Sequence, residues 1–340
     1  MHFRFIARLA ALLVAAAGAA HAADKVNVGL TMSTADAPIF IGVERGYFKK
    51  DNLDVEIISL DSASKAVAPL ATGDLDVAAG SPSAGFFNAA ARKIEIRIVA
   101  NRALAMPGYN YQSVIVRKDL MGSRFKSYAD LKGLKIGIPA PGTGGQVLID
   151  EMARLGGLQY GDVEQVFLPF PQLIIALQNK AVDIALMIEP YASAAVASGA
   201  GHRFAPTESF YPHQEIAMLF YGEKFARERA DVARRFMKGW LRGARDFNDV
   251  TANGVWSPGA GEIIGIVAKA IGMKPEQIST APPQFTHPDG AINIESVRRD
   301  LAFYRSKGMI NSETVKADDV VDMSFVAAAV KELGPYKRKP

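Results

Sequence analysis

The sequence predicts an α/β protein made of two similar lobes. Two observations support this: short apolar strands alternate with helical segments, and that alternation occurs twice along the chain. The chain has 340 residues, of which 49% are hydrophobic and 22% charged. A chain of this length and composition has enough apolar material for two domains of ordinary size, each with its own core.

Residues 1–22 are predicted to be a secretory signal peptide. Arg4 and Arg8 flank an apolar run that ends in AHA at residues 20–22, a small-x-small cleavage pattern. The run is much shorter than the roughly 20 apolar residues that span a membrane. Its removal lowers the formal net charge from +4 to +2, so the charge gives little reason to expect nucleic-acid binding. We therefore expect an exported, most simply periplasmic, protein.

The chain contains no cysteine. This excludes disulfides, cysteine-ligated zinc, a thiol nucleophile and lipid attachment through a cysteine. The histidines form no pair with metal-ligand spacing, and no G-x-S-x-G nucleophile elbow is present. The sequence thus predicts a binding protein without metal or cofactor, and not an enzyme.

The first part of the mature chain follows the order expected of an open α/β sheet. Strands are predicted over residues 26–30, 53–60, 75–80 and 94–100, and helices over residues 37–50, 62–72 and 83–92. Pro38 marks the start of the first helix and Gly73 the end of the second. Such alternation is typical of strands that run parallel and are covered by their connecting helices.

The same plan is repeated later in the chain. When VGL at residues 28–30 is aligned with IGI at residues 136–138, LDVA at residues 75–78 falls opposite VDIA at residues 182–185. The spacings from Val28 to Asp76 and from Ile136 to Asp183 are 48 and 47 residues. Matching elements in the same order at matching spacing predict two topologically similar lobes.

Two longer strand-like stretches, at residues 109–120 and 213–225, flank the second copy. We interpret them as the places where the chain crosses between lobes, so that the second lobe is an insertion on two hinge segments. The predicted division is a signal peptide at 1–22, a first lobe at 23–112 and 222–340, and a second lobe at 113–221. The chain after residue 226 is predicted to be mainly helical, and an aromatic stripe that includes Trp240 is interpreted as core packing.

The loop at residues 137–145 raises the question of a nucleotide site. Gly137 and Gly142 have P-loop spacing, but Thr143 stands where the lysine is needed, and the third glycine of a dinucleotide fingerprint is missing. A glycine-rich turn before a helix still offers backbone N–H groups and the positive end of the helix dipole to an anion or a polar acceptor. Thr143 is expected either to cap this helix or to contact a ligand.

Three other strand-to-helix turns have a similar design. They are TMSTADAP at residues 31–38, SPS at residues 81–83 and EPY at residues 189–191. Open α/β sheets bind ligands at the carboxyl ends of their strands. If the lobes face each other, four helix N-termini therefore meet at one cleft.

Several motifs resemble those of the substrate-binding proteins of ABC importers for nitrate, sulfonates, taurine and thiamine-pyrimidine precursors. They are GVERGYF at residues 42–48, GDLDVA at residues 73–78 and DLKGLKIG at residues 130–137, within a resemblance that runs from about Lys25 to the 220s. The resemblance implies a type II periplasmic binding protein fold. In that fold, two lobes, each a mixed five-stranded sheet flanked by helices, are joined by two crossovers and close on the ligand.

The resemblance also implies ligand contacts from the four turns. The residues at the matching positions are Ser33, Thr34, Asp36, Gly80, Ser81, Ser83, Thr143, Gly144, Gly145 and Glu189. Tyr191, Tyr111 and Tyr211 are expected either as aromatic walls of the cleft or as core residues. Arg102 is expected either to pair with an anionic ligand or to be a solvated loop residue.

These observations predict a monomeric periplasmic protein that binds a small polar molecule and delivers it to an inner-membrane ABC permease with its ATPase. The ligand's charge stays open: helix N-termini and Arg102 favour a sulfonate or carboxylate, whereas Asp36 and Glu189 favour an amine or pyrimidine. A partner of a signalling receptor and a periplasmic enzyme are the alternatives. The family's eukaryotic pyrimidine-forming enzymes depend on a cysteine-rich segment, which this chain lacks.

Overall fold

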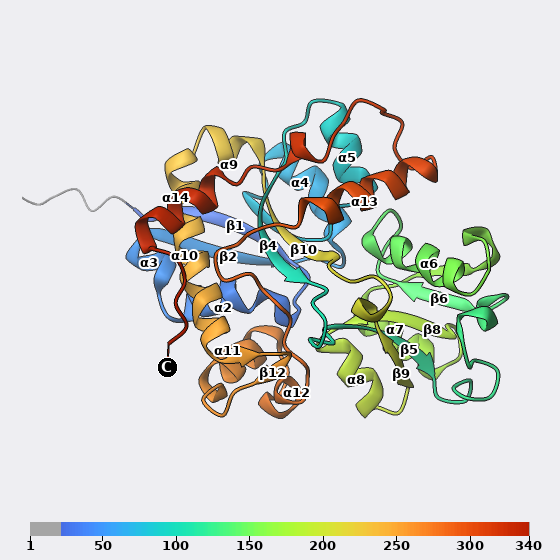
Figure 1. The fold of residues 1–340 in the computed structure, drawn as a ribbon. Coiled ribbons are helices and arrows are strands. Elements are labelled where there is room, and N and C mark those ends of the chain that lie inside the picture. The colour runs from blue at the N-terminus through green and yellow to red at the C-terminus, as the bar shows by residue number, and fades with distance from the viewer. Residues whose placement is uncertain (1–21, 340) are drawn as a thin grey trace, which may run out of the picture.

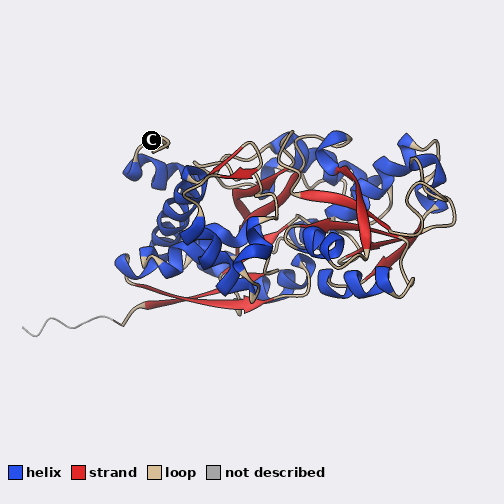
Figure 2. Ribbon diagram, turned by 90° about the horizontal axis from the view of Figure 1, so that it is seen from below, coloured by secondary structure: helices blue, strands red, loops and turns tan. Residues whose placement is uncertain are grey.

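The computed structural model describes residues 22–339 and contains two five-stranded sheets, one in each lobe (Figure 1). The strand orders are β2-β1-β3-β10-β4 and β7-β6-β8-β5-β9. Helices enclose both sheets (Figure 2). The predicted α/β class with a mixed five-stranded sheet in each lobe is confirmed. The predicted signal peptide lies, apart from Ala22, outside the described residues.

The first lobe begins with β1 (Asp24–Leu30), which pairs in parallel with β2 (Leu53–Ser59) and β3 (Val77–Gly80). The remaining elements before the first crossover are η1 (Thr34–Asp36), α2 (Ala37–Glu44), α3 (Tyr47–Lys50), η2 (Ala63–Ala66), α4 (Val67–Thr72), α5 (Ala84–Ala91) and β4 (Arg97–Leu104). The helix predicted over residues 37–50 is divided at Gly46, whose φ of 68° is a left-handed conformation that glycine adopts without steric cost.

The second lobe repeats this arrangement. Its strand β6 (Lys135–Ile138) pairs in parallel with β7 (Glu164–Phe167) and β8 (Ile184–Ile188), as β1 does with β2 and β3. The other elements are β5 (Gln112–Arg117), η3 (Tyr128–Leu131), α6 (Gly144–Leu155), η4 (Tyr160–Asp162), α7 (Phe170–Gln178), α8 (Tyr191–Ala197), β9 (Gly201–Pro206) and η5 (Thr207–Ser209).

The strand β10 (Glu215–Tyr221) corrects one predicted boundary. It pairs antiparallel with β3 and β4 and therefore belongs to the first lobe, although residues 113–221 were assigned to the second. The chain re-enters the first lobe before Glu215. The apolar run after the second crossover forms β10, which lies between β3 and β4 in the first sheet. The predicted start of the second lobe at residue 113 agrees with the structure to within one residue, because Gln112 already pairs with Ile188 in the second sheet.

The C-terminal part covers the first lobe (Figure 1). Its elements are α9 (Glu223–Arg227), α10 (Ala230–Asp249), β11 (Thr251–Ala252), β12 (Val255–Trp256), α11 (Gly261–Ile271), α12 (Pro275–Ser279), α13 (Ile294–Ser306), η6 (Asp318–Val320) and α14 (Ser324–Leu333). Phe236, Trp240 and Phe247 of α10 are completely buried, which confirms the core-packing interpretation of the aromatic stripe. No helix among the described residues is long and apolar enough to cross a membrane.

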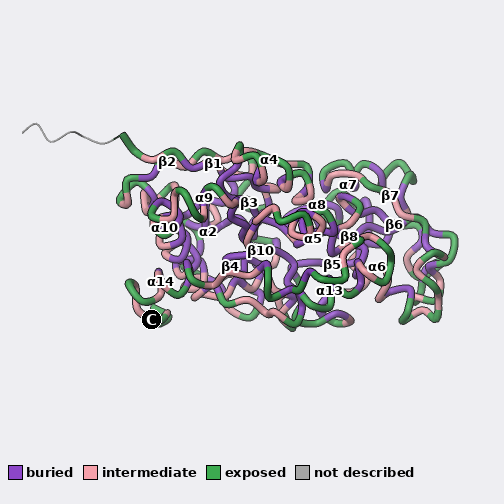
Figure 3. The backbone as a smooth tube through the Cα atoms, turned by 90° about the horizontal axis from the view of Figure 1, so that it is seen from above, coloured by how far each residue is buried: buried purple, intermediate pink, exposed green. Residues whose placement is uncertain are grey.

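The lobes are in contact with each other. One continuous hydrophobic cluster contains Phe86 and Met218 of the first lobe, Ile136 and Leu148 of the second, and Leu301 of α13. Buried backbone runs through both lobes and through the region between them (Figure 3). The two lobes are therefore packed against each other.

Candidate functional site

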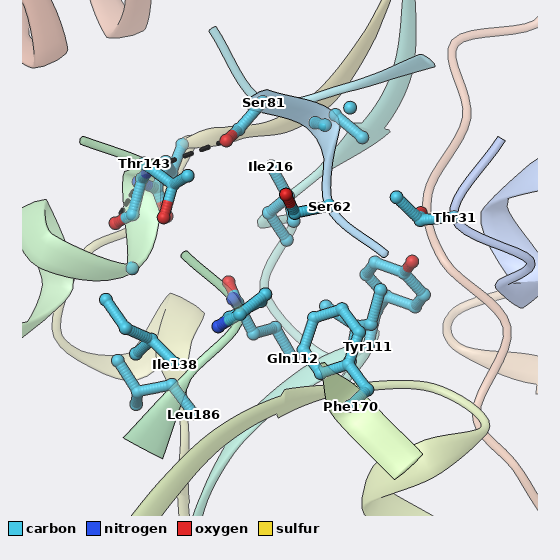
Figure 4. Close-up of a pocket in the computed structure, with 18 of the residues that line it drawn as sticks. Thr31, Ser62, Ser81, Tyr111, Gln112, Ile138, Thr143, Phe170, Leu186 and Ile216 are labelled. Atoms are coloured by element: carbon cyan, nitrogen blue, oxygen red, sulfur yellow. Dashed lines mark hydrogen bonds between the residues drawn. The ribbon is translucent and has the colours of Figure 1, made fainter. Parts of the chain in front are cut away.

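A cleft lies between the lobes at the carboxyl ends of the parallel strands (Figure 4). Its volume is about 660 Å³, and part of this space is open to solvent. Six of the predicted site residues line it, namely Gly80, Ser81, Arg102, Thr143, Gly144 and Gly145. Tyr111 also lines the cleft, which agrees with the prediction that it forms an aromatic wall.

The remaining lining residues were not among the predicted contacts. They are Thr31, Ser62, Ala63, Gln112, Ile138, Pro139, Phe170, Leu186, Ile188, Gln214, Ile216 and Ala217. Ile138 and Ile188 are the last residues of β6 and β8, so the strand-end rule applied to every strand would have found them. Gln112 and Gln214 lie at the crossovers, where neither motif nor strand end points to a ligand.

The N-terminus of α6 reaches the cleft from the second lobe. The Thr143 hydroxyl donates to the carbonyl of Ala140 at 2.9 Å and makes no capping bond to α6. It therefore stabilises the turn that precedes the helix. The Gly144 N–H donates to Ser81 Oγ of the first lobe at 3.4 Å. The Gly145 N–H has no acceptor among the described residues, although Gly145 lines the cleft. A backbone donor at a helix N-terminus is therefore available to a ligand.

Gly80 shapes the opposite wall. A Cβ built on Gly80 would lie 2.0 Å from the Cβ of Ala63 in η2, closer than any real contact. Any side chain at this position would push η2 away from β3. The glycine is thus required by the packing of the cleft wall.

Arg102 is a buried member of an ion pair and not a solvated loop residue, so that alternative is wrong. It lies within β4, is 1% exposed, and pairs with the fully buried Asp36. Burial raises the pKa of Asp36, while Arg102 and the Ser33 N–H act in the opposite direction. The Nε of Arg102 has no hydrogen-bond partner among the described residues. Asp36 thus fixes the buried guanidinium group of a residue that lines the cleft.

The other predicted contacts do not line the cleft. They are Ser33, Thr34, Asp36, Ser83, Glu189 and Tyr191. The Ser83 hydroxyl accepts the Phe86 N–H at 3.1 Å and so caps α5. The Glu189 carboxylate is fully buried, pairs with Arg203 and accepts the Ser193 N–H at 3.1 Å. Tyr211, the third tyrosine considered, lies against Asp300 outside the cleft.

Several of these residues instead join the two lobes. The Thr34 N–H donates to the carbonyl of Glu189 at 3.3 Å, and the Tyr191 hydroxyl donates to the carbonyl of Met32 at 2.9 Å. Burial raises the pKa of Tyr191 to about 12, so its hydroxyl keeps its proton at neutral pH. The turns predicted to face a ligand therefore also hold the lobes together.

The cleft lining combines polar and apolar side chains. Among the described lining residues Arg102 is the one charged side chain. Figure 4 shows Ser81, Ser62 and Thr31 on one side with Ile216 next to Ser62. Across from them lie Ile138, Leu186 and Phe170, together with Gln112 and Tyr111. Such a surface suits a ligand with a polar head and an apolar body. Within residues 22–339, no group of three or more histidine or acidic side chains is placed to hold a metal ion.

The model of the NMT1-like family matches residues 19–254. The chain belongs to the NMT1-like family. The match ends about thirty residues beyond the point where the sequence resemblance faded, and it includes both crossovers and the whole of the second lobe. The fold that the sequence resemblance predicted is confirmed, because solved nitrate- and sulphonate-binding periplasmic proteins share it.

A protein of Brucella abortus (strain 2308) that is named as a binding protein is similar to this NMT1-like chain. It is 25% identical over 215 residues, which amount to 63% of this chain and 62% of the relative. The match thus spans less than two thirds of the relative's length.

Solved structures of two periplasmic binding proteins share the fold. The nitrate-binding protein NrtA of Synechocystis PCC 6803 has a TM-score of 0.74 at 15% identity, covering 92% of this chain and 89% of its own. The aliphatic sulphonate-binding protein SsuA of Escherichia coli has a TM-score of 0.67 at 16% identity, covering 88% and 92%. The desulfurization enzyme DSZB has a TM-score of 0.61 at 13% identity. At such identities these likenesses show the fold alone, which serves binding proteins and an enzyme.

Proposed function

We propose that the protein is the periplasmic, monomeric solute-binding component of an ABC importer, and that its ligand is a small organic anion with a sulfonate or carboxylate head. The observation that carries the proposal is the cleft lining, which combines one buried arginine with hydroxyl and amide groups and with apolar side chains. The fold and the family support a binding protein, and the lining supports the class of ligand.

Both lobes offer donors to the anionic head. Arg102 contributes a guanidinium group from the first lobe, and α6 contributes the Gly145 N–H and its dipole from the second. A ligand that bonds to both lobes binds the closed form more tightly than the open form and shifts the population toward it. The permease then recognises the closed form.

The cleft lining suits an amine or a pyrimidine less well than an anion. Asp36 and Glu189, the acids that would accept its N–H groups, are paired with Arg102 and Arg203 and do not line the cleft. An organic cation would meet the guanidinium group of Arg102 without a nearby free carboxylate. The apolar wall of Ile138, Leu186 and Phe170 instead accommodates an alkyl or aryl group attached to the anionic head.

An enzymatic role receives less support from the lining. The described lining residues include no histidine, carboxylate or lysine, so the Ser81 and Thr143 hydroxyls lack an adjacent base. The desulfurization enzyme of the same fold makes turnover worth measuring. A signalling partner would bind ligand in the same way, and uptake with the permease distinguishes the two roles.

Three probes with the same four-carbon tail test the proposal: 1-butanesulfonate, pentanoate and butylamine. Calorimetry and thermal unfolding of the mature protein should show that at least one anion binds and raises the melting temperature, whereas butylamine does not. Tighter binding of butylamine, or no binding of any probe, would refute the anion proposal. A product formed during incubation would favour the enzyme alternative. Native mass spectrometry of the purified protein identifies any molecule that copurifies.

A further inference from the structure

Tyr191 of the second lobe bonds to the first lobe without lining the cleft. It is the first residue of α8, and its hydroxyl donates to the carbonyl of Met32 at 2.9 Å. Met32 belongs to the turn that follows β1 in the first lobe. Because a carbonyl oxygen can only accept, the hydroxyl must be the donor of this bond. The Tyr191 side chain is therefore a hydrogen-bonded bridge between the lobes.

The Tyr191 ring packs on a residue that does line the cleft. Its centre lies 5.4 Å from the centre of the Phe170 ring, and the two ring planes are 12° apart, which is a parallel stack. Phe170 is the first residue of α7, and its side chain is seen among those that line the cleft (Figure 4). Phe170 thus connects the bridge of Tyr191 to the ligand space.

The turn that accepts this bond is held by the second lobe at a further point. The Thr34 N–H donates to the carbonyl of Glu189 at 3.3 Å. Met32 has a φ of 56°, a left-handed conformation that costs free energy for a residue with a side chain and that surrounding contacts must offset. The residue before it, Thr31, lines the cleft. Both ends of the Tyr191 bridge are therefore next to residues of the cleft.

A bond that forms only when the lobes are together favours the closed form. In an open form, water takes the place of the partner at both the hydroxyl and the carbonyl, so only the net free energy of the bond counts. For one hydrogen bond between neutral groups this shifts the ratio of closed to open protein about fivefold. The bond also requires the Tyr191 ring in one orientation, and the stack with Phe170 limits the rotation of that ring.

We propose that Tyr191 is a positioning residue for closure: stacked on Phe170, it holds its hydroxyl against the Met32 carbonyl and so couples ligand contact at Phe170 to the joining of the lobes. This inference rests on the proposed function where it concerns a ligand in the cleft. A ligand body packed against Phe170 restricts that ring, and the stacked Tyr191 ring then keeps the orientation that reaches the first lobe. By reciprocity, the bond to Met32 favours the ligand.

The separation of the lobes is measured without any ligand. Because the chain has no cysteine, Leu155→Cys and Glu228→Cys provide one exposed labelling site in each lobe without background. Pulsed electron paramagnetic resonance between two spin labels gives the populations of short and long distances. Tyr191→Phe keeps the ring and removes the hydroxyl, so we expect the ratio of short to long distances to fall about fivefold. An unchanged distance distribution overturns the proposal.

Tyr221→Phe is the matched control. The Tyr221 hydroxyl also donates to a backbone carbonyl, that of Ala233 at 3.0 Å, but both residues belong to the first lobe. We expect a lower midpoint of urea unfolding in this variant and an unchanged distance distribution. A distribution that shifts as far as in Tyr191→Phe would mean that any loss of stability opens the lobes, and it would overturn the role of Tyr191.

Phe170→Leu tests whether the stack positions the hydroxyl. It removes the stacked ring and keeps an apolar side chain at the cleft. We expect it to lower the ratio of short to long distances in the natural background and to have no further effect in the Tyr191→Phe background, because the bond that it weakens is already absent. Independent effects of the two substitutions would overturn the coupling between Phe170 and Tyr191.

Calorimetry with 1-butanesulfonate tests the link to the ligand. We expect about fivefold weaker affinity in Tyr191→Phe, since a smaller share of the protein is closed, and an unchanged affinity in Tyr221→Phe. Equal affinities in the natural protein and in Tyr191→Phe would overturn the link. Failure of 1-butanesulfonate to bind the natural protein counts against the anion proposal, while the ligand-free distances still decide the role of Tyr191.

Discussion

Each lobe contains a buried carboxylate paired with an arginine, and the two pairs differ in where the arginine lies. Asp36 pairs with Arg102, which is almost fully buried and lines the cleft. Glu189 pairs with Arg203, whose side chain is 30% exposed and also bonds to Ser113. The chemical groups are alike, so residue type does not separate a pair at the cleft from a pair away from it. The position of the arginine relative to the cleft does.

The largest difference between the pairs should appear when the arginines are replaced by methionine. Arg102→Met leaves Asp36 buried without its counter-charge and should lower the free energy of unfolding by about 3–5 kcal/mol. It should also abolish binding of 1-butanesulfonate. Urea unfolding and calorimetry measure the two effects. Addition of Asp36→Asn should restore much of the stability but not the binding, and unchanged affinity in Arg102→Met would contradict the assigned role.

Arg203→Met is the matched change in the other lobe. Because water reaches the site of Arg203 and the Ser193 N–H still bonds to Glu189, the loss of unfolding free energy should be smaller, about 2 kcal/mol. The affinity for 1-butanesulfonate should stay within about twofold. A loss of affinity equal to that of Arg102→Met would mean that both pairs serve the ligand.

Gly144→Val tests the contribution of the second lobe to the cleft. A Cβ at Gly144 would lie 3.3 Å from Gln214 Nε2 and 3.6 Å from Ser81 Cβ, so the crowding falls between the lobes and not within one. Affinity should fall about tenfold, or about 1.4 kcal/mol, with little change in the unfolding midpoint. Gly161→Val, at a position with no atom near an added Cβ, should change neither quantity. Unchanged affinity in Gly144→Val would exclude this turn from the site.

The smallest effect concerns the start of α5. Ser83→Ala removes the hydroxyl that accepts the Phe86 N–H, and it should lower the unfolding free energy by about 1 kcal/mol without changing affinity. Urea unfolding and calorimetry again measure both quantities. A loss of affinity instead of stability would return Ser83 to the set of ligand contacts.

Repetition along the chain made the architecture predictable. The match between residues 28–30 and 136–138, with almost equal spacing to the next strand, indicated two similar sheets, and the structure contains them. The strand β10 was assigned to the wrong lobe because its amino-acid sequence shows only that the segment is apolar. Which sheet it joins depends on hydrogen bonds to β3 and β4, and these strands are more than 100 residues earlier.

The site was predicted in part. Strand-end turns found Ser81 and Gly144, which line the cleft, and also Asp36 and Glu189, which do not. A carboxylate in such a turn has the same sequence signature whether it meets a ligand or an arginine. The partner arginine, 66 residues from Asp36 and 14 from Glu189, decides between the two outcomes, and single-residue patterns carry no information about it.

The bonds that join the lobes have a consequence for how such a receptor can change its specificity. Ala84 to Gly142 and Thr34 to Glu189 are contacts between backbone atoms, at 2.8 and 3.3 Å. Substitution of a side chain leaves these backbone atoms in the chain, and the cleft-lining residues Ile138, Leu186 and Phe170 make neither of these two bonds. The apolar lining can therefore change without loss of these two bonds between the lobes. If the ligand is the proposed anion, replacement of the apolar lining should change which anion binds while these bonds between the lobes remain, as a reusable element for a fluorescent sensor.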